Sequence, residues 1–353
     1  MEIKRLRLFI YDEEKKKSFY YRLFEFLRDS SLKDYVIDKG YDNGYNIQIL
    51  IREKQSFEEV ISFFESYVPV RQLPLRERRL QELVICKLMN MEEINMDSDE
   101  MMIEDEGVYI VDHISIAKLE DKYKMQFKDI WSILLKRQQF LNIFIPKLTN
   151  LESVYLYLLL LCCITADSYP TGISDGAISF RSNYEYYMKQ LELLDLDETN
   201  KEKIKKFMIE KTEQDQEDEK NLIELFFESD KILSDPIVLE YKRYLEFSRQ
   251  LITKNFDQNL YYNQNLYTAS DFFDRVKEPS DFHNRFYRIP KIIQLYTNRD
   301  FIVHRYILSL LYELFPLGNF SNRTKQKVIG HTANIIESQT NRNIKEAVDS
   351  WER

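Results

Sequence analysis

The chain has 353 residues and a formal net charge of −9, with 44% hydrophobic and 31% charged residues. This balance is ordinary for a globular protein with a buried core. The negative charge argues against sequence-independent nucleic-acid binding, because contacts to phosphate need a basic surface. The net charge does not exclude a local basic groove.

The cysteines and the apolar runs of the sequence indicate in which cellular compartment the protein is expected. Cys86, Cys162 and Cys163 fit neither a disulfide framework nor a zinc pattern, which favours a reducing cytoplasm. The first residues lack the apolar stretch of a signal peptide. The longest apolar run, residues 154–166, is too short to span a bilayer. We therefore expect a soluble, cytoplasmic protein without a membrane partner, in which residues 154–166 form a buried helix.

The first part of the chain alternates between strand and helix patterns. Hydrophobic alternation predicts a strand at residues 3–11 and a hairpin whose turn contains Asn43-Gly44, a typical turn sequence. Helices are predicted at residues 13–29 and 56–67, the second with Ser56 and Glu59 as a capping box. This order of strand, helix, hairpin and helix predicts a ferredoxin-like split β-α-β module. A further strand is expected at 107–114, after an acidic run at 97–106 that we expect to be solvated.

The rest of the chain has mainly helical periodicity. Its expected helices are residues 116–142, 150–166, 183–194, 200–228, 236–254, 302–315 and 322–338. The fold class is therefore α+β. We expect an N-terminal α+β module at residues 1–114 and a mainly helical region at 115–353 that completes one compact catalytic domain.

A glycine-containing stretch, GISDGAISFRSNYEYYMKQL at residues 172–191, is the first candidate site. Glycine allows a backbone to turn sharply or to approach another group closely. Ser179, Arg181, Ser182, Asn183 and Tyr184 follow, where the helix is expected to begin. They would enter a pocket, with the Arg181 guanidinium as a donor to carbonyl or carboxylate groups. The alternative is an ordinary loop with Ser182 or Asn183 as the helix cap.

Two further groups of polar residues are candidates. In the hairpin, alternation places Asn46 and Gln48 on one face, where they contact a peptide or simply face solvent. In the helix at 300–315, His304 is expected to face the core. Arg305, Ser309 and Tyr312 share another stripe, which offers donors and a weak acid to a cleft or faces solvent.

The usual catalytic signatures are missing from the sequence. It contains no GxGxxG, phosphate loop, HExxH, paired CxxC or GxSxG motif. The four histidines, His113, His283, His304 and His331, do not have metal-ligand spacing. Chemistry without a metal or other cofactor is therefore expected.

Taken together, these residues resemble the small stand-alone members of the lanthipeptide-dehydratase family, the thiopeptide-type bacteriocin biosynthesis proteins. The family's hairpin motif, Gly-Pro-His followed by alternating apolar and Arg residues, corresponds to Gly44-Tyr45-Asn46-Ile47-Gln48-Ile49. Its motif G-x-x-S-[FY]-R-S-H-x-E is similar to residues 176–185, GAISFRSNYE. Arg305, Tyr312 and Asn322-Arg323 resemble the closing segment. The resemblance implies a helical region like the dehydratase elimination domain.

The positions at which this sequence differs from the family motifs favour one of the family's activities over another. Asn46 and Asn183 replace both family histidines, and Gln48 stands where an arginine is usual. These losses count against elimination of glutamate from glutamylated Ser or Thr. The family also includes thiopeptide pyridine synthases, whose reaction joins two dehydroalanines by a formal aza-[4+2] cycloaddition, with loss of water and of the leader peptide. This is the leading prediction. A non-catalytic partner that binds the precursor peptide is a third alternative.

The resemblance also suggests a role for each candidate residue. Arg181 and Arg305 would polarise carbonyls, Tyr312 would donate a proton, and Ser179 and Ser309 would position the peptide. Asn46, Gln48, Ser182, Asn183 and Tyr184 would contact it. The implied partner is a modified precursor peptide whose leader adds a strand to the hairpin edge. No cofactor is implied, and homodimer formation stays open.

Overall fold

The computed structural model describes residues 3–52, 55–91, 103–149, 153–193, 197–229, 232, 234–258, 280–286 and 298–344. Within them the chain forms two compact units, Met1–Thr149 (unit 1) and Asn150–Arg353 (unit 2). The expected boundary after residue 114 falls inside unit 1, between its last strand and the helices that follow. The chain is α+β, as predicted, since one unit contains a small sheet and the helices of both units make up most of the rest.

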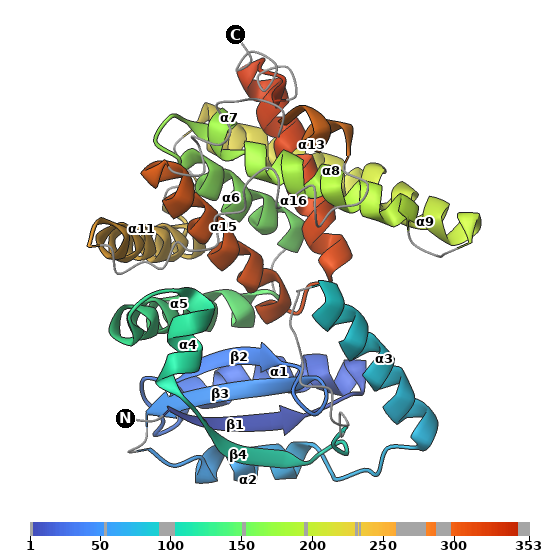
Figure 1. Cartoon of the computed structure of the whole chain (residues 1–353), viewed down its shortest axis with the longest axis vertical. Helices are drawn as coiled ribbons and strands as arrows, with labels where there is room; N and C mark the ends of the chain where they lie inside the picture. The colour runs from blue at the N-terminus through green and yellow to red at the C-terminus, as the bar shows by residue number, and fades with distance from the viewer. Residues whose placement is uncertain are drawn as a thin grey trace. The chain divides into compact units, whose positions relative to one another are not determined.

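Unit 1 is built around a four-stranded antiparallel sheet in the order β2-β3-β1-β4 (Figure 1). Its elements are β1 (Ile3–Phe9), α1 (Glu13–Asp29), β2 (Val36–Gly40), β3 (Asn46–Arg52), α2 (Glu58–Tyr67), α3 (Leu75–Met91), β4 (Tyr109–Ile114), α4 (Ile116–Tyr123) and α5 (Phe127–Lys147). The predicted strands and the first helix are therefore present. The helix expected at 116–142 is two helices, because Lys124 adopts a left-handed conformation with φ 49°.

The apolar face of the sheet is covered by α1. Leu6, Leu8 and Ile49 are fully buried, and alternation along the strands puts them on one face. Lys39 of β2 belongs to the same face, and its ammonium lies 4.8 Å from the Tyr20 ring of α1. Helix α2 packs beside α1 through ring contacts of Phe19 with Phe63 and Phe64. Burial of large rings supplies the core of this layer.

The hairpin turn matches its sequence signal. Asn43 and Gly44 have φ of 61° and 119°, a conformation that glycine and asparagine adopt at low cost. In contrast, the predicted capping box at α2 is wrong. Phe57 is the N-cap, and the Glu59 carboxylate accepts from the backbone N–H and hydroxyl of Ser31 at 3.2 and 2.9 Å.

Helix α5 closes the outer edge of the hairpin. Gln138 accepts the Ile37 backbone N–H at 2.8 Å, and Arg137 donates to the Ile37 carbonyl at 3.3 Å. An edge strand normally leaves such groups available for a further strand. The expectation that a leader peptide adds to the hairpin edge is therefore not supported at Ile37. At the opposite edge, no strand of the described residues pairs with the outer side of β4, where Tyr109 and Val111 are exposed.

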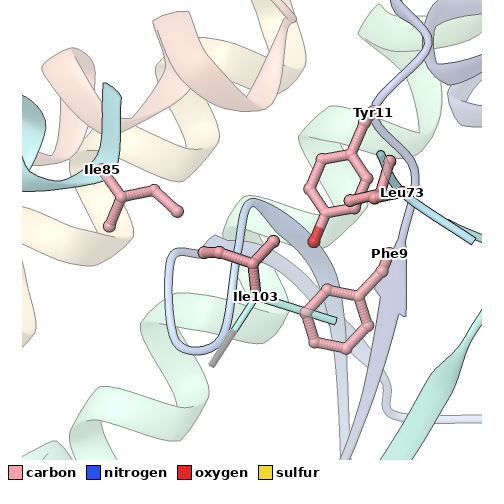
Figure 2. Close-up of a cluster of buried hydrophobic side chains, with 5 residues drawn as sticks. All are labelled: Phe9, Tyr11, Leu73, Ile85 and Ile103. Carbon is pink, nitrogen blue, oxygen red and sulfur yellow. The ribbon is translucent and has the colours of Figure 1, made fainter. Parts of the chain in front are cut away.

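A second apolar cluster lies on the other face of the sheet. Figure 2 shows Phe9, Tyr11, Leu73, Ile85 and Ile103, all buried. They come from β1 and the residues after it, from α3 and the residues before it, and from the segment before β4. The acidic run leads into this segment; its residues 97–102 lie outside the described residues. Glu106, expected to be solvated, is buried. It accepts the backbone N–H groups of Tyr11 and Asp12 at 3.3 and 3.0 Å and pairs with Arg71 at 2.6 Å.

Unit 2 is entirely helical within the described residues. Its elements are α6 (Val154–Asp167), α7 (Ile173–Gly176), α8 (Ile178–Leu193), α9 (Glu198–Ile209), α10 (Glu213–Leu222), the π-helical turn η1 (Ile223–Glu228), α11 (Pro236–Asp257), α13 (Asp281–Phe286), α15 (Arg299–Leu317) and α16 (Asn322–Thr340). The helix expected at 200–228 is thus interrupted after Ile209. The predicted pair α15 and α16 is present.

Helix α6 is the centre of unit 2 and packs against α7, α10, α11, α15 and α16. Its residues Leu158 to Ala166 are all buried, as expected for a helix that is apolar on every side. The prediction of a buried helix here is confirmed. None of the helices in the described parts of the chain combines the length and the apolar character needed to cross a membrane.

The glycine-containing stretch differs from its prediction in one respect. Gly172 has φ of 107° and precedes α7, and Gly176 lies against α6. However, α8 begins at Ile178, so Ser182 and Asn183 lie inside the helix and neither is its cap. Residues that we expected on a turn therefore project from successive sides of α8.

Candidate active site

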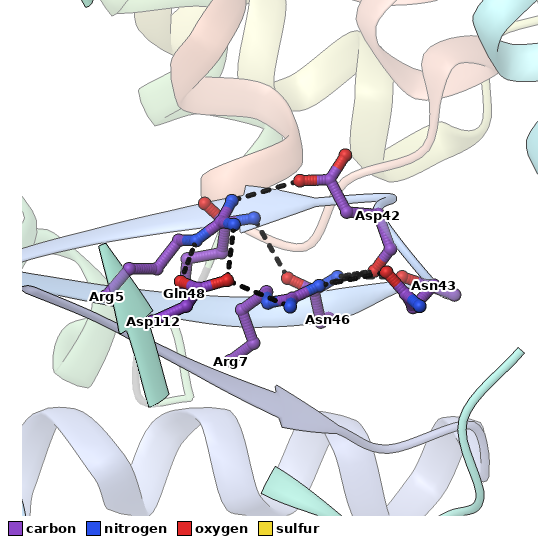
Figure 3. A network of polar contacts seen from close by, with 8 residues as sticks. Arg5, Arg7, Asp42, Asn43, Asn46, Gln48 and Asp112 are labelled. Atoms are coloured by element: carbon purple, nitrogen blue, oxygen red, sulfur yellow. Dashed lines mark hydrogen bonds and ion pairs between the residues drawn. The ribbon is translucent and has the colours of Figure 1, made fainter. Parts of the chain in front are cut away.

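Unit 1 carries a polar network on the sheet face opposite α1 (Figure 3). Arg5 and Arg7 point to this face because side chains two residues apart on a strand share a face. The pairing register places Arg7 opposite Gln48 and Arg5 opposite Asp112. Asn46 lies on the same face, so the predicted alternation of Asn46 and Gln48 is confirmed.

The two arginines share Asp112. Arg5 donates from Nε and Nη2 to the two oxygens of Asp112 at 2.7 and 2.8 Å, and its Nη1 lies 3.0 Å from Asp42. Arg7 Nη2 lies 2.9 Å from the same Asp112 carboxylate. Burial opposes ionisation of Asp112, but Arg5 and then Arg7 outweigh it, so its pKa is below the usual value. Two cations thus face two carboxylates, leaving no surplus positive charge.

Asn46 and Gln48 form hydrogen bonds within the hairpin. Asn46 is fully buried; its amide donates to the carbonyls of Asp42 and Gly44 at 3.0 and 2.8 Å and accepts from Gln48 at 3.0 Å. A Cβ at Gly40 would stand 1.7 Å from the Gln48 amide nitrogen, so glycine leaves room for Gln48. The polar atoms of Asn46 are therefore engaged within unit 1.

In unit 2, Arg181 connects α8 to α16. Its Nε and Nη2 donate to the Glu337 carboxylate at 3.2 and 2.8 Å, and Nη2 also donates to Asn334 at 2.6 Å. Glu185, one turn along α8, is 3.8 Å away. Arg181 is 6% exposed. A buried guanidinium held bidentately is a strong interhelical contact, and none of these partners belongs to α15.

Tyr312 of α15 lies beside the α8 motif. Its ring centroid is 6.4 Å from that of Phe180, and its phenol oxygen is buried. Burial raises the pKa of Tyr312, and the neighbouring Asn183 amide lowers it only in part. Asn183 in turn accepts from Gln326 of α16 at 3.2 Å. The phenol therefore stays protonated across the neutral range and can act as a hydrogen-bond donor.

Ser182 lies on a different side of α8 and contacts a histidine that the motif did not include. Ser182 Oγ is 2.9 Å from Nε2 of His283, on α13, and His283 Nδ1 is 2.6 Å from Ser280 Oγ. His283 is 3% exposed, and burial lowers its pKa to about 4. The imidazole is therefore neutral at pH 7, with one nitrogen as donor and one as acceptor.

The remaining predicted residues have varied surroundings. Ser309 is exposed and donates to the Arg305 backbone carbonyl at 3.0 Å. Tyr184 packs against α16, where a Cβ at Gly330 would be 2.4 Å from its ring. Ser179 and Arg305 are half-buried. His304 is buried as predicted, and Gly176 offers its backbone carbonyl to Nε2 at 3.2 Å.

The structure thus brings some of the predicted residues together and separates others. Tyr312 and Asn183 meet between α15, α8 and α16, while Arg181 faces the far end of α16. His283 was missed because no motif includes it; its burial and serine partners become visible only in the fold. Arg5 and Arg7 did carry a sequence signal, since charged residues alternating within an apolar strand indicate a polar patch on one face.

Metal binding has no candidate in the parts of the chain that the structure describes. No three His, Cys, Asp or Glu side chains among those residues gather closely enough to hold an ion. Cys162 and Cys163 are buried in α6, and burial raises the pKa of Cys163 well above its usual value.

Comparison with known proteins identifies similarity at the level of structure. No protein-family model matches the sequence, and no curated protein matches it. The pyridine synthase TbtD from thiomuracin biosynthesis shares the fold with a TM-score of 0.66 and 11% identity, over 96% of this chain and 98% of that chain. TsrL shares it with a TM-score of 0.57 and 13% identity, over 98% of this chain and 97% of that chain. The resemblance predicted from short motifs is therefore confirmed in structure, and the chain has the fold of a thiopeptide pyridine synthase along nearly its whole length.

Proposed function

We propose that the protein matures a thiopeptide precursor by joining two dehydroalanines in a formal aza-[4+2] cycloaddition, with loss of water and leader peptide. The observation that carries this proposal is the near-complete coverage of both chains in the comparison with TbtD. The sheet order β2-β3-β1-β4 further supports the ferredoxin-like interpretation of unit 1. A cytoplasmic location and a leader-bearing peptide substrate belong to the same proposal.

Physical chemistry makes such a reaction accessible without a cofactor. Holding two alkenes in contact can remove about 7–11 kcal/mol from a barrier through proximity and orientation. The remaining steps are proton transfers, for which hydroxyls, phenols and imidazoles are sufficient. Unit 2 offers such groups in Tyr312, Ser182 and His283. Arg305, Ser179 and Ser309 stay proposed as polarising and positioning groups, with Asn183 and Tyr184 as peptide contacts.

Charge pairing in the sheet network favours this reaction over glutamate elimination. Elimination releases an anionic amino acid and calls for cationic groups that can receive it. Arg5 and Arg7 are already paired with Asp112 and Asp42, so they present no net positive charge to a glutamate. A network of balanced charges and amides such as Gln48 suits an uncharged peptide better.

Incubation with a dehydrated, azole-bearing precursor peptide, followed by mass spectrometry, tests the proposal. Cycloaddition predicts a macrocycle and a released leader peptide in equal amounts. The same assay with a glutamylated precursor tests elimination, which predicts loss of glutamate and no macrocycle. Tight binding of the peptide with no change of mass in either assay would reject both reactions and favour a non-catalytic partner.

A matched pair of variants links the activity to the site. Tyr312→Phe removes only a hydroxyl from a buried ring, whereas Tyr109→Phe removes one from an exposed ring on β4. We expect the first to slow macrocycle formation and the second to leave it unchanged. Equal rates for both variants would remove Tyr312 from the proposed site.

A further inference from the structure

A chain of three side chains in unit 2 has the arrangement of an oriented base and a hydroxyl. Ser182 Oγ lies 2.9 Å from His283 Nε2, and Ser280 Oγ lies 2.6 Å from His283 Nδ1. A hydroxyl, a base and a third group that orients the base, all within hydrogen-bond reach, is the arrangement that activates hydroxyls in many enzymes. The sequence motif at residues 176–185 includes Ser182 but neither Ser280 nor His283.

We infer the tautomer of His283 from its contact with the third group. Ser280 immediately precedes α13, and its Oγ accepts the backbone N–H of His283 at 3.4 Å. A hydroxyl oxygen has two lone pairs, so the same oxygen can also accept from Nδ1–H. Because a neutral imidazole has one donor and one acceptor, we assign the Nε2 lone pair to Ser182, which donates its proton to it.

The three side chains differ in their exposure to solvent. Ser280 and His283 are buried, with exposed fractions of 6% and 3%, whereas Ser182 is half-buried. Tyr186, one turn further along α8, is 36% exposed, and its ring lies edge-on 5.9 Å from the imidazole. Phe282 packs edge-on at 5.5 Å. The imidazole therefore packs against two rings, and Ser182 is the least buried of the three side chains.

We propose that Ser182 and His283 are the proton-transfer pair that converts a peptide amide into its iminol, with Ser280 as the residue that positions the imidazole. This inference rests on the proposed function, since the iminol supplies the aza-diene. The amide N–H proton passes to Ser182 Oγ while the Ser182 proton passes to His283 Nε2; the nitrogen electron pair forms C=N and the carbonyl π pair moves to oxygen. The imidazolium then returns its proton through Ser182 to that oxygen, and no proton is gained or lost overall.

Four variants test the pair on the dehydrated, azole-bearing precursor. His283→Gln can keep hydrogen bonds to both serines but cannot take up a proton, so kcat is expected to fall by about 10²-fold or more with little change in KM. The kcat of Ser182→Ala should fall by a similar factor. Ser182→Thr, which keeps a hydroxyl, should retain most of the wild-type kcat. His304→Gln is the matched control, because His304 is equally buried but contacts a backbone carbonyl; it should keep the wild-type kcat.

Chemical rescue separates a proton-transfer role from a purely structural one. Imidazole added to His283→Ala should restore turnover, and the restored rate should rise as pH increases through about 6.5, the ordinary value for an imidazole, because only the neutral form is a base. Rescue that is independent of pH would assign His283 a structural role and overturn the inference.

The outcomes distinguish this inference from the proposed function. If the wild-type protein forms the macrocycle and His283→Gln does so at the same rate with an unchanged Tm, the inference is wrong and the function stands. If the wild-type protein forms no macrocycle, the function fails and the iminol role fails with it. Nitrogen-15 NMR of the imidazole tests the geometry independently: a proton on Nε2 at pH 7 would contradict the assigned tautomer.

Discussion

At the scale of single residues, Arg181 shows that a motif residue expected to contact substrate can instead form hydrogen bonds to neighbouring side chains of the fold. The sequence placed it in a polar cluster, and its type suits carbonyl recognition. In the fold, Glu337 and Asn334 engage its donors on α16. Its catalytic role stays a prediction, while its contact between α8 and α16 gives it a structural role.

Arg181→Ala tests which role dominates. Because a hydrogen bond to a charged group contributes about 1.5–3 kcal/mol, we expect the variant to lower the free energy of unfolding by about that amount and to reduce Tm, as measured by thermal and urea denaturation. Glu337→Ala should have a similar effect, and the double variant should cost less than the sum. An unchanged Tm with lost turnover would restore the catalytic interpretation.

Tyr312 leads to a prediction about pH. Burial raises the pKa of its phenol, so the group stays protonated beyond the ordinary tyrosine range near pH 10. If it donates a hydrogen bond during the reaction, turnover should not decline between pH 7 and about pH 10 through this residue. A decline at high pH that disappears in Tyr312→Phe would show that the phenol ionises in that range.

At the scale of elements, the start of α2 depended on contacts that the sequence does not display. Ser56 and Glu59 have capping-box spacing, yet Glu59 binds Ser31, which is brought close only by the packing of α1 beside α2. A true capping box occurs instead at Thr212 and Asp215 of α10. Strands and long amphipathic helices were predictable because their periodicity is local. The start of α2, and side-chain pairs such as Ser182 with His283, were not, because their partners lie far along the chain.

The short helix α7 is held against α6 by close backbone contact. A Cβ at Gly176 would lie 2.1 Å from the backbone carbonyl oxygen of Ala166, which cannot rotate away as a side chain can. Gly176→Ala should therefore destabilise unit 2 by about 1–3 kcal/mol through overpacking. Ser174→Ala, at a half-buried position of the same helix, is the control, and urea denaturation of the two variants gives the comparison. Equal stability of both would mean that α7 can shift away from α6.

At the scale of the whole molecule, buried histidines link stability to pH. Burial lowers the pKa of both His283 and His304 to about 4, below the value of about 6.5 in an unfolded chain. The unfolded state therefore binds more protons between these values, so stability is complete above pH 6.5 and is lost as pH falls toward 4.

Urea denaturation between pH 7.5 and pH 4 measures this dependence. One pKa unit corresponds to 1.36 kcal/mol, so each histidine contributes a loss of about 3 kcal/mol across the window. His304→Gln should remove about half of the dependence in this range. A stability that stays flat from pH 7 to pH 5 would show that both histidines remain accessible to protons in the folded protein.

The two edges of the sheet in unit 1 differ in the contacts that the described residues make with them. Arg137 and Gln138 occupy the backbone groups of Ile37 on one side, while Tyr109 and Val111 remain exposed on the other. Within the part of the chain that the structure describes, a fifth strand from a ligand, a second molecule or an aggregate therefore meets side chains of α5 beside β2 and no paired strand beside β4.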